Sequence, residues 1–206
     1  MPPVPRVDLA FPVGGEAVDV STRALVAGVV PLPRFGREAE AAATAASIAG
    51  QGADLVDLSL PARLIGSVAS SSPVPVVARV GSLEDALAAA HAGASAILAL
   101  APLLVDLCGH SDLLTSGAVP VLVLDDLSGL PEASAMAAGL RVPLAFDSTR
   151  LPAAPAIGCE AAAIADGCRL VRTADVRRSR RVAEVMAAIL AARHGTHTPD
   201  HGEERA

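Results

Sequence analysis

The sequence predicts an α/β protein, a reduced TIM-type (β/α) barrel with about seven clear strands. Short apolar runs alternate with Ala-rich helical segments, a pattern typical of parallel βαβ units with right-handed crossovers. The 206 residues suffice for one buried domain but fall short of the roughly 250 of a full eight-unit barrel. We therefore expect one barrel unit to be missing, in a domain spanning residues 23–193 between an irregular lead-in (1–22) and a disordered tail (194–206).

The individual elements follow from these runs and from the residues that interrupt them. Ser82 is a good N-cap, with Glu84 and Asp85 in the first turn of the helix that it would begin. The lead-in is expected to be irregular or to form a short strand pair at the barrel floor. Strands are predicted at Ala24–Val30, Ala53–Leu60, Val74–Val80, Gly93–Leu100, Val119–Leu124, Val142–Phe146 and Arg169–Arg172. Helices are predicted at Arg37–Ala49, Ser82–Ala92, Leu103–Leu114, Pro131–Ala138 and Arg177–Arg193.

Composition excludes several classes of function. Hydrophobic residues make up 52% of the chain, with three Phe and neither Trp nor Tyr, so the core must be built from Ala, Val and Leu. The formal net charge of −6 argues against a general nucleic-acid surface. The chain contains no Lys, which excludes Schiff-base catalysis, a P-loop lysine and a lysine general base.

The cysteines and the N-terminus carry no sign of a metal centre or of targeting. Cys108, Cys159 and Cys168 are widely spaced, so we expect small buried thiols and neither a zinc site nor a disulfide framework. The N-terminal residues lack the charged and apolar regions of a signal peptide, and no apolar stretch is long enough to span a membrane. A cytoplasmic protein without metal or cofactor is the expectation.

The stretch Gly167–Val176 carries the strongest functional signal. Its short apolar strand delivers Arg172 and Asp175 to the C-terminal end, where barrel enzymes place polar site residues. Arg172, with Arg150 and Ser148, could hold a phosphate or another anion, because guanidinium groups bind phosphate in a bidentate manner. The competing interpretation is an ion pair of Arg172 with Asp175 that caps the following helix.

Other polar residues are weaker candidates. Asp57, Asp125 and Asp147 stand in or after predicted strands, where a carboxylate could act as acid or base. The pair Asp125-Asp126 could hold a metal, although a turn is the simpler interpretation. The lone residues His91 and His110 are expected on a helix surface and in a loop.

Two charged segments at the end of the chain have more than one interpretation. The run Arg177-Arg178-Ser-Arg180-Arg181 is expected to be a solvated face, but an acidic partner or a nucleotide phosphate would also account for it. The His-containing tail that starts at His194 could chelate a metal, but disorder is the expectation.

Several segments, in order, resemble dihydropteroate synthase. They are Ala24–Val30, Gly52–Leu58, Val74–Val80, Ala92–Ile97 and Gly167–Val176. The most specific is the last, where the Arg-X-His-Asp-Val pattern of the family stands as Arg172-Thr-Ala-Asp-Val176. The resemblance implies a (β/α)₈ barrel that joins a pterin pyrophosphate to p-aminobenzoate, and dimerisation through outer helices.

The departures from the family pattern fall on its ligand-binding residues. The Asn-containing segment after the first strand is replaced by Pro31-Leu-Pro-Arg-Phe35, and the Gly-Glu-Ser-Thr-Arg-Pro loop by Ser59–Leu64. Where the third strand of the family ends in Ile-Asp-Thr, with its Asp on the pterin, this chain has Ala78-Arg-Val-Gly81. The Ser-Arg-Lys of the family corresponds to Ser148-Thr-Arg150 without the lysine. An unmatched pterin edge would cost several kcal/mol.

These departures predict a dihydropteroate-synthase-like protein that has lost the reaction. We expect a non-catalytic binding or assembly subunit, either a homo-oligomer or bound to a protein partner, with a residual site for a small phosphorylated ligand. The alternative is an active phosphate-binding barrel enzyme with a changed substrate. It would be a folate-pathway transferase or resemble thiamine-phosphate synthase, which shares the pattern Gly81-Ser-Leu-Glu-Asp-Ala followed by Gly93-Ala.

Overall fold

The computed structural model describes residues 10–13, 16–20, 23–31, 38–58 and 62–195. The tail from 196 onward, and most of the segments after the first two barrel strands, lie outside these residues. The strands are β1 Ala10–Val13, β2 Glu16–Asp19, β3 Leu25–Val29, β4 Leu55–Asp57, β5 Val76–Arg79, β6 Ala96–Ala99, β7 Val119–Leu124, β8 Leu144–Asp147 and β9 Leu170–Thr173. The helices are α1 Glu38–Gly50, α2 Ala62–Ser71, α3 Leu83–His91, α4 Ala101–Cys108, α5 Ser111–Ser116, α6 Leu130–Leu140, α7 Ala153–Ala165 and α8 Val176–Gly195.

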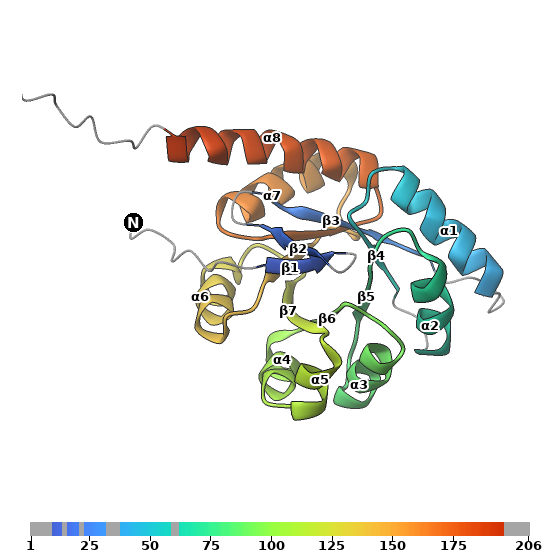
Figure 1. Ribbon diagram of the computed structural model, residues 1–206. Helices are drawn as coiled ribbons and strands as arrows, with labels where there is room; N and C mark the ends of the chain where they lie inside the picture. Colours follow the sequence, from blue (N-terminus) through green and yellow to red (C-terminus); the bar gives the residue numbers. More distant parts are fainter. Residues whose placement is uncertain (1–9, 14–15, 21–22, 32–37, 59–61, 196–206) are drawn as a thin grey trace, which may run out of the picture.

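Strands β3 to β9 form a closed, seven-stranded parallel barrel, with the helices arranged around its outside (Figure 1). The barrel closes where β9 pairs with β3, in a register that places Leu170 beside Leu25 and Arg172 beside Ala27. The prediction of a barrel with seven strands is confirmed. No described helix has the length and apolar character needed to cross a membrane.

The predicted elements match the observed ones except in three places. The strand Val119–Leu124 is found with its predicted bounds, and the others agree to within a few residues. The predicted helix Leu103–Leu114 is two helices, because the chain breaks at Gly109 and His110 between α4 and α5. Helices α2 and α7 were not predicted, since Pro and Gly interrupt their apolar pattern at the start or in the body.

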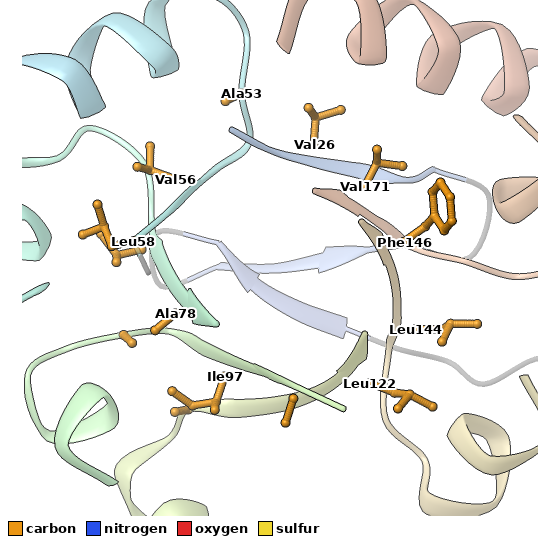
Figure 2. Close-up of a cluster of buried hydrophobic side chains, with 14 of the residues drawn as sticks. Val26, Ala53, Val56, Leu58, Ala78, Ile97, Leu122, Leu144, Phe146 and Val171 are labelled. Carbon is orange, nitrogen blue, oxygen red and sulfur yellow. The ribbon is translucent and has the colours of Figure 1, made fainter. Parts of the chain in front are cut away.

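The N-terminal strand pair is present as an antiparallel hairpin, with Val13 opposite Glu16. Val20, directly after β2, is 1% exposed and belongs to the same buried cluster as Leu25 and Leu170, the first residues of β3 and β9. The hairpin, which Figure 2 shows through the ring of barrel strands, therefore lies at the N-terminal end of the barrel.

Alternate residues of each barrel strand belong to two separate cores, as the two-residue period of a strand requires. One core fills the barrel and consists mainly of small side chains, such as Ala27, Val77 and Ala145. The other lies between the barrel and the helices, and Figure 2 shows Val26 and Phe146 on that outer side. The expected core of Ala, Val and Leu is thus found, with Phe146 as its largest fully buried side chain.

Gly28 in β3 packs closely against both α1 and α8. A Cβ atom at this position would overlap Ile48 Cγ2 of α1 and lie 2.7 Å from Val176 Cγ2 of α8. We expect Gly28→Ala to lower the free energy of unfolding by about 1–3 kcal/mol, the usual cost of overpacking. Urea denaturation monitored by circular dichroism measures this change.

The matched control is Gly139→Ala in α6, where a Cβ would meet no atom within 4 Å. This substitution is expected to stabilise the protein by up to about 1 kcal/mol, because Ala favours the helix. Equal effects of the two substitutions would contradict the close packing of α1 and α8 on β3.

Candidate functional site

Three barrel strands end in an ionisable residue that faces into the barrel at its C-terminal mouth, and a fourth, β9, has one at its second-last position. Each stands two positions after an apolar residue of the inner core and therefore points to the same side of the strand. These residues are Asp57 after Leu55, Arg79 after Val77, Asp147 after Ala145, and Arg172 after Leu170. A fifth, Asp125, follows directly after β7. We call Asp57, Arg79, Asp125, Asp147 and Arg172 the mouth cluster.

Arg172 is held by two carboxylates from different strands. The side chain is almost fully buried, and its Nε donates a hydrogen bond to Asp57 Oδ2. Its Nη1 donates to Asp147 Oδ2 at 2.7 Å and to Thr149 Oγ1 at 3.3 Å. Arg172 therefore ties β9 to β4 and to β8 across the barrel mouth.

Arg79 extends the same network to β7. Its Nη1 donates to Asp147 Oδ2, and its Nη2 lies 2.9 Å from both Oδ1 and Oδ2 of Asp125. Asp147 thus lies between the two arginines and is bound by both. The mouth cluster contains two guanidinium groups and three carboxylates, so that negative charge is in excess when all are ionised.

The surroundings shift the pKa values of the two buried carboxylates of the mouth cluster in opposite directions. Burial raises the pKa of Asp57, outweighing the opposing charge of Arg172, and Asp57 Oδ1 has no hydrogen-bond partner among the described residues. Burial also acts to raise the pKa of Asp147, but the hydrogen bond from the Thr149 hydroxyl and the charge of Arg172 lower it overall. Burial acts to lower the pKa of Arg172, but Asp57 and Asp147 raise it overall. The Arg172–Asp147 pair is therefore firmly ionised, whereas Asp57 is the group that accepts a proton more readily.

The structure does not bring the three residues of the predicted anion site together. Ser148 points away from the mouth, because its hydroxyl donates to Glu160 Oε1 at 2.6 Å and to the carbonyl of Arg172 at 3.2 Å. Arg150 is exposed beyond the end of β8. Only Arg172 lies in the mouth cluster, and its guanidinium is bound by carboxylates.

Asp175 caps helix α8, but without the ion pair to Arg172 that the competing interpretation included. Its Oδ1 accepts a hydrogen bond of 3.1 Å from the backbone N–H of Arg178. The ion pairs of Arg172, however, are formed with Asp57 and Asp147, so the capping role does not depend on Arg172.

The remaining candidate residues lie outside the mouth cluster, in a turn, at helix ends or in the core. Asp126 forms a turn, because its Oδ1 accepts from the backbone N–H of Ser128 at 2.8 Å. His91 is exposed in the last turn of α3, and His110 precedes α5. Cys168 is a buried thiol, as expected, and burial raises its pKa to about 12, whereas Cys108 and Cys159 are only half-buried.

A second buried polar cluster was not predicted. Glu160 on α7 is completely buried, and its Oε1 accepts hydrogen bonds from Ser148, from Ser179 Oγ at 2.8 Å and from Arg178 Nη2 at 3.1 Å. Thr173 at the end of β9 joins through Ser179, at 2.9 Å. The cluster fixes α7 and α8 to the ends of β8 and β9. It could not be found without α7, on which Glu160 lies.

Arg79 was also missed as a site residue, although the sequence contained a signal. Arg79 stands at the end of a strand whose alternate residue Val77 is apolar, so a two-residue period places it inside a closed barrel. An arginine inside a barrel requires carboxylate partners, and two of the barrel strands end in Asp while a third is followed directly by Asp125.

Comparison with solved structures identifies the fold. The chain is similar to dihydropteroate synthase from Yersinia pestis, with a TM-score of 0.65, 16% identity, and coverage of 91% of this chain and 99% of the other. It is similar to the enzyme from Stenotrophomonas maltophilia, solved with imidazole bound in the active site (TM-score 0.64, 18% identity, 86% and 96% coverage). It is also similar to the enzyme from Vibrio fischeri (TM-score 0.61, 12% identity, 86% and 97% coverage).

No protein-family model matches the chain, and no curated protein matches it by sequence. The structural likeness nevertheless shows that the protein has the fold of dihydropteroate synthase, as the sequence resemblance implied. The structural likeness defines the class as dihydropteroate-synthase-like barrels.

Proposed function

We propose that this protein is a non-catalytic, dihydropteroate-synthase-like barrel that acts as a binding or assembly subunit. The observation that carries the proposal is the mouth cluster, in which carboxylates of the same chain bind both guanidinium groups. A phosphate or pyrophosphate would have to displace Asp57 or Asp147 from Arg172. Beside Arg172 it would also meet the negative charge of Asp147, and like charges repel.

The position of Arg79 supports the loss of a pterin site. In the family pattern the third barrel strand ends in an aspartate that binds the pterin, and the corresponding position here is Arg79. A guanidinium has only donors and cannot accept the hydrogen bonds that a pterin donates. Moreover, Arg79 is bound to Asp125 and Asp147. The chain thus uses this part of the barrel for its own ion pairs.

The outer helices supply a surface for assembly. Ile157 of α7 and Val185 and Ile189 of α8 are large apolar side chains that are exposed. Clustered exposed apolar residues mark interaction surfaces more often than free surface. We propose that these helices carry contacts to another subunit, as a homodimer or with a protein partner, in a cytoplasmic role close to folate biosynthesis.

Thermal-shift titration of the full chain tests the proposal. Pterin pyrophosphate, p-aminobenzoate, inorganic pyrophosphate and a panel of sugar and nucleotide phosphates, each at about 1 mM, are expected to raise the Tm by less than about 1 °C. The Yersinia pestis enzyme, titrated with pterin pyrophosphate, is the positive control. Stabilisation of this chain by pterin pyrophosphate, with release of pyrophosphate when p-aminobenzoate is added, would overturn the proposal.

The second candidate function is an active barrel enzyme with a changed substrate. The observation in its favour is the environment of Asp57. A buried carboxyl with a raised pKa and an unpartnered oxygen is typical of an acid or base in an active site. A phosphate compound that stabilises the protein but fails to stabilise Asp57→Asn would favour this alternative.

A further inference from the structure

Asp57, the last residue of β4, is the most deeply buried group of the mouth cluster. Its neighbours Val56 and Leu58 belong to the outer core, and Figure 2 shows both on the outer side of the barrel, so Asp57 points inward. Asp57 Oδ2 accepts a hydrogen bond from Arg172 Nε, whereas Oδ1 is buried and has no partner among the described residues. A negative charge on this carboxyl is therefore poorly solvated.

The charges of the mouth cluster leave Asp57 with the weakest compensation. Both oxygens of Asp125 lie 2.9 Å from Arg79 Nη2, and Asp147 is bound by both guanidinium groups. Within the described part of the chain, the only ion pair of Asp57 is with Arg172, which it shares with Asp147. Two guanidinium groups thus face three carboxylates, and the uptake of one proton makes the cluster neutral. The Oδ1 atom of Asp57, which faces no donor, is the atom at which this proton would bind.

The charged groups that face Asp57 come from three other strands. Burial is the largest cause that raises the pKa of Asp57, and the charge of Asp147 on β8 raises it further. The charges of Arg172 on β9 and Arg79 on β5 lower the pKa without reversing the shift. Strand β3, which pairs with β4, carries no ionisable residue. Helix α1 packs on β4, and the acidic residues of its first turn are exposed: Glu38 and Glu40.

We propose that the mouth cluster is a proton-dependent switch, in which Asp57 Oδ1 holds one proton and release of that proton to water opens the C-terminal end of β4. With the proton bound, Asp57 is neutral, its Oδ2 still accepts from Arg172 Nε, and two guanidinium groups face two carboxylates. After release, the charge on Oδ1 is stabilised by contact with water, which requires the end of β4 to separate from its neighbours. The switch goes beyond the proposed function and rests on the interpretation of the mouth cluster as an internal ion-pair network.

Two backbone hydrogen bonds report on the end of β4. The N–H of Leu58 donates to the carbonyl of Val77 on β5 at 2.9 Å. The N–H of Val30, directly after β3, donates to the carbonyl of Asp57 at 3.0 Å. Separation of β4 from these neighbours breaks both bonds and exposes the two amides to exchange with solvent.

The opening is expected to increase as the pH rises. In the open state Asp57 is solvated and its pKa is the ordinary 3.8, whereas in the closed state burial raises the pKa above this value. Below pH 3.8 both states hold the proton, and the closed state has its greatest advantage. Between 3.8 and the raised pKa only the closed state holds the proton, so the opening constant grows by up to about tenfold per pH unit. Above the raised pKa the opening constant levels off.

Native-state hydrogen exchange of the full chain, measured by NMR over a series of pH values, tests the switch. Each rate is divided by that of an unstructured chain at the same pH. The protection of Leu58 and Val30 is expected to fall as the pH rises, and to stay constant in Asp57→Asn, because Asn has the shape of the protonated carboxyl and cannot ionise. The internal control is Val119, whose N–H donates to the carbonyl of Ser95 at 3.0 Å, at the opposite end of the barrel.

Matched variants separate the charge of the cluster from burial alone. Arg79→Gln removes a positive charge that faces Asp57 and is expected to shift the pH dependence to higher pH. Arg150→Gln removes an exposed arginine beyond the end of β8 and should leave it unchanged. Asp126→Asn, at an exposed carboxyl beside the cluster, should also keep the wild-type behaviour. Far-UV circular dichroism shows that each variant is folded.

A carbon-13 NMR titration of the Asp carboxyl groups measures the proton directly. One carboxyl is expected to titrate above 3.8 and to be missing from the spectrum of Asp57→Asn. The inference is overturned if Asp57 titrates at or below 3.8, if Asp57→Asn keeps the pH-dependent exchange, or if Val119 loses protection to the same extent as Leu58. The proposed function fails separately, through stabilisation by pterin pyrophosphate, because no measurement of the switch includes a ligand.

Discussion

Arg172→Ala is expected to lower the free energy of unfolding by about 3–5 kcal/mol, because it leaves buried carboxylates without their counter-charge. Asp57 is completely buried and Asp147 is nearly so, and Arg172 is bound to both. The loss also removes a tie between three barrel strands. Guanidinium chloride denaturation at pH 7, analysed by linear extrapolation, measures the difference.

The control for this experiment is Arg150→Ala, which removes an exposed arginine after the same strand that carries Asp147. It is expected to change stability by less than about 0.5 kcal/mol. If Arg172→Ala left the stability unchanged and instead abolished stabilisation by phosphate, Arg172 would belong to an anion site. The interpretation of the mouth cluster as an internal ion-pair network would then be wrong.

Glu160→Ala is expected to have a comparable effect at the outer layer, about 3–5 kcal/mol, because it removes the common acceptor of three buried or half-buried donors. Ser148, Ser179 and Arg178 all donate to Glu160 Oε1. Without it, α7 and α8 lose their polar attachment to the ends of β8 and β9. The midpoint of thermal unfolding, followed by circular dichroism, should fall accordingly.

Glu184→Ala is the matched control on α8, since its carboxylate is 63% exposed and is bound by Arg180 at 3.0 Å. Exposed pairs of this kind contribute about 0.3–0.5 kcal/mol. A loss at Glu160 no larger than the loss at Glu184 would show that the buried cluster contributes nothing beyond a surface ion pair.

Much of the barrel could be predicted from the sequence, and the failures have local causes. Buried parallel strands are continuous apolar runs, so residues such as Val119–Leu124 were assigned with correct bounds. Helix α7 was missed because Pro155 and Gly158 weaken its pattern, although Pro is tolerated in the first turn of a helix. With α7 missing, Glu160 had no predicted position, and the buried cluster around it could not be foreseen.

The sequence alone determined the strand order, the loss of one unit, the absence of lysine chemistry and the dihydropteroate-synthase-like fold. The first three follow from local periodicity and composition, whereas the dihydropteroate-synthase-like fold was implied by the resemblance of segments such as Gly167–Val176 to that family. Only the tertiary structure decided the partners of Arg172, because Asp57 lies 115 positions earlier and the closure of the barrel brings the two together. The tertiary structure also gave Arg79 its role. In the sequence this residue is only a departure from the family pattern, but in the closed barrel its side chain points inward and pairs with Asp125 and Asp147.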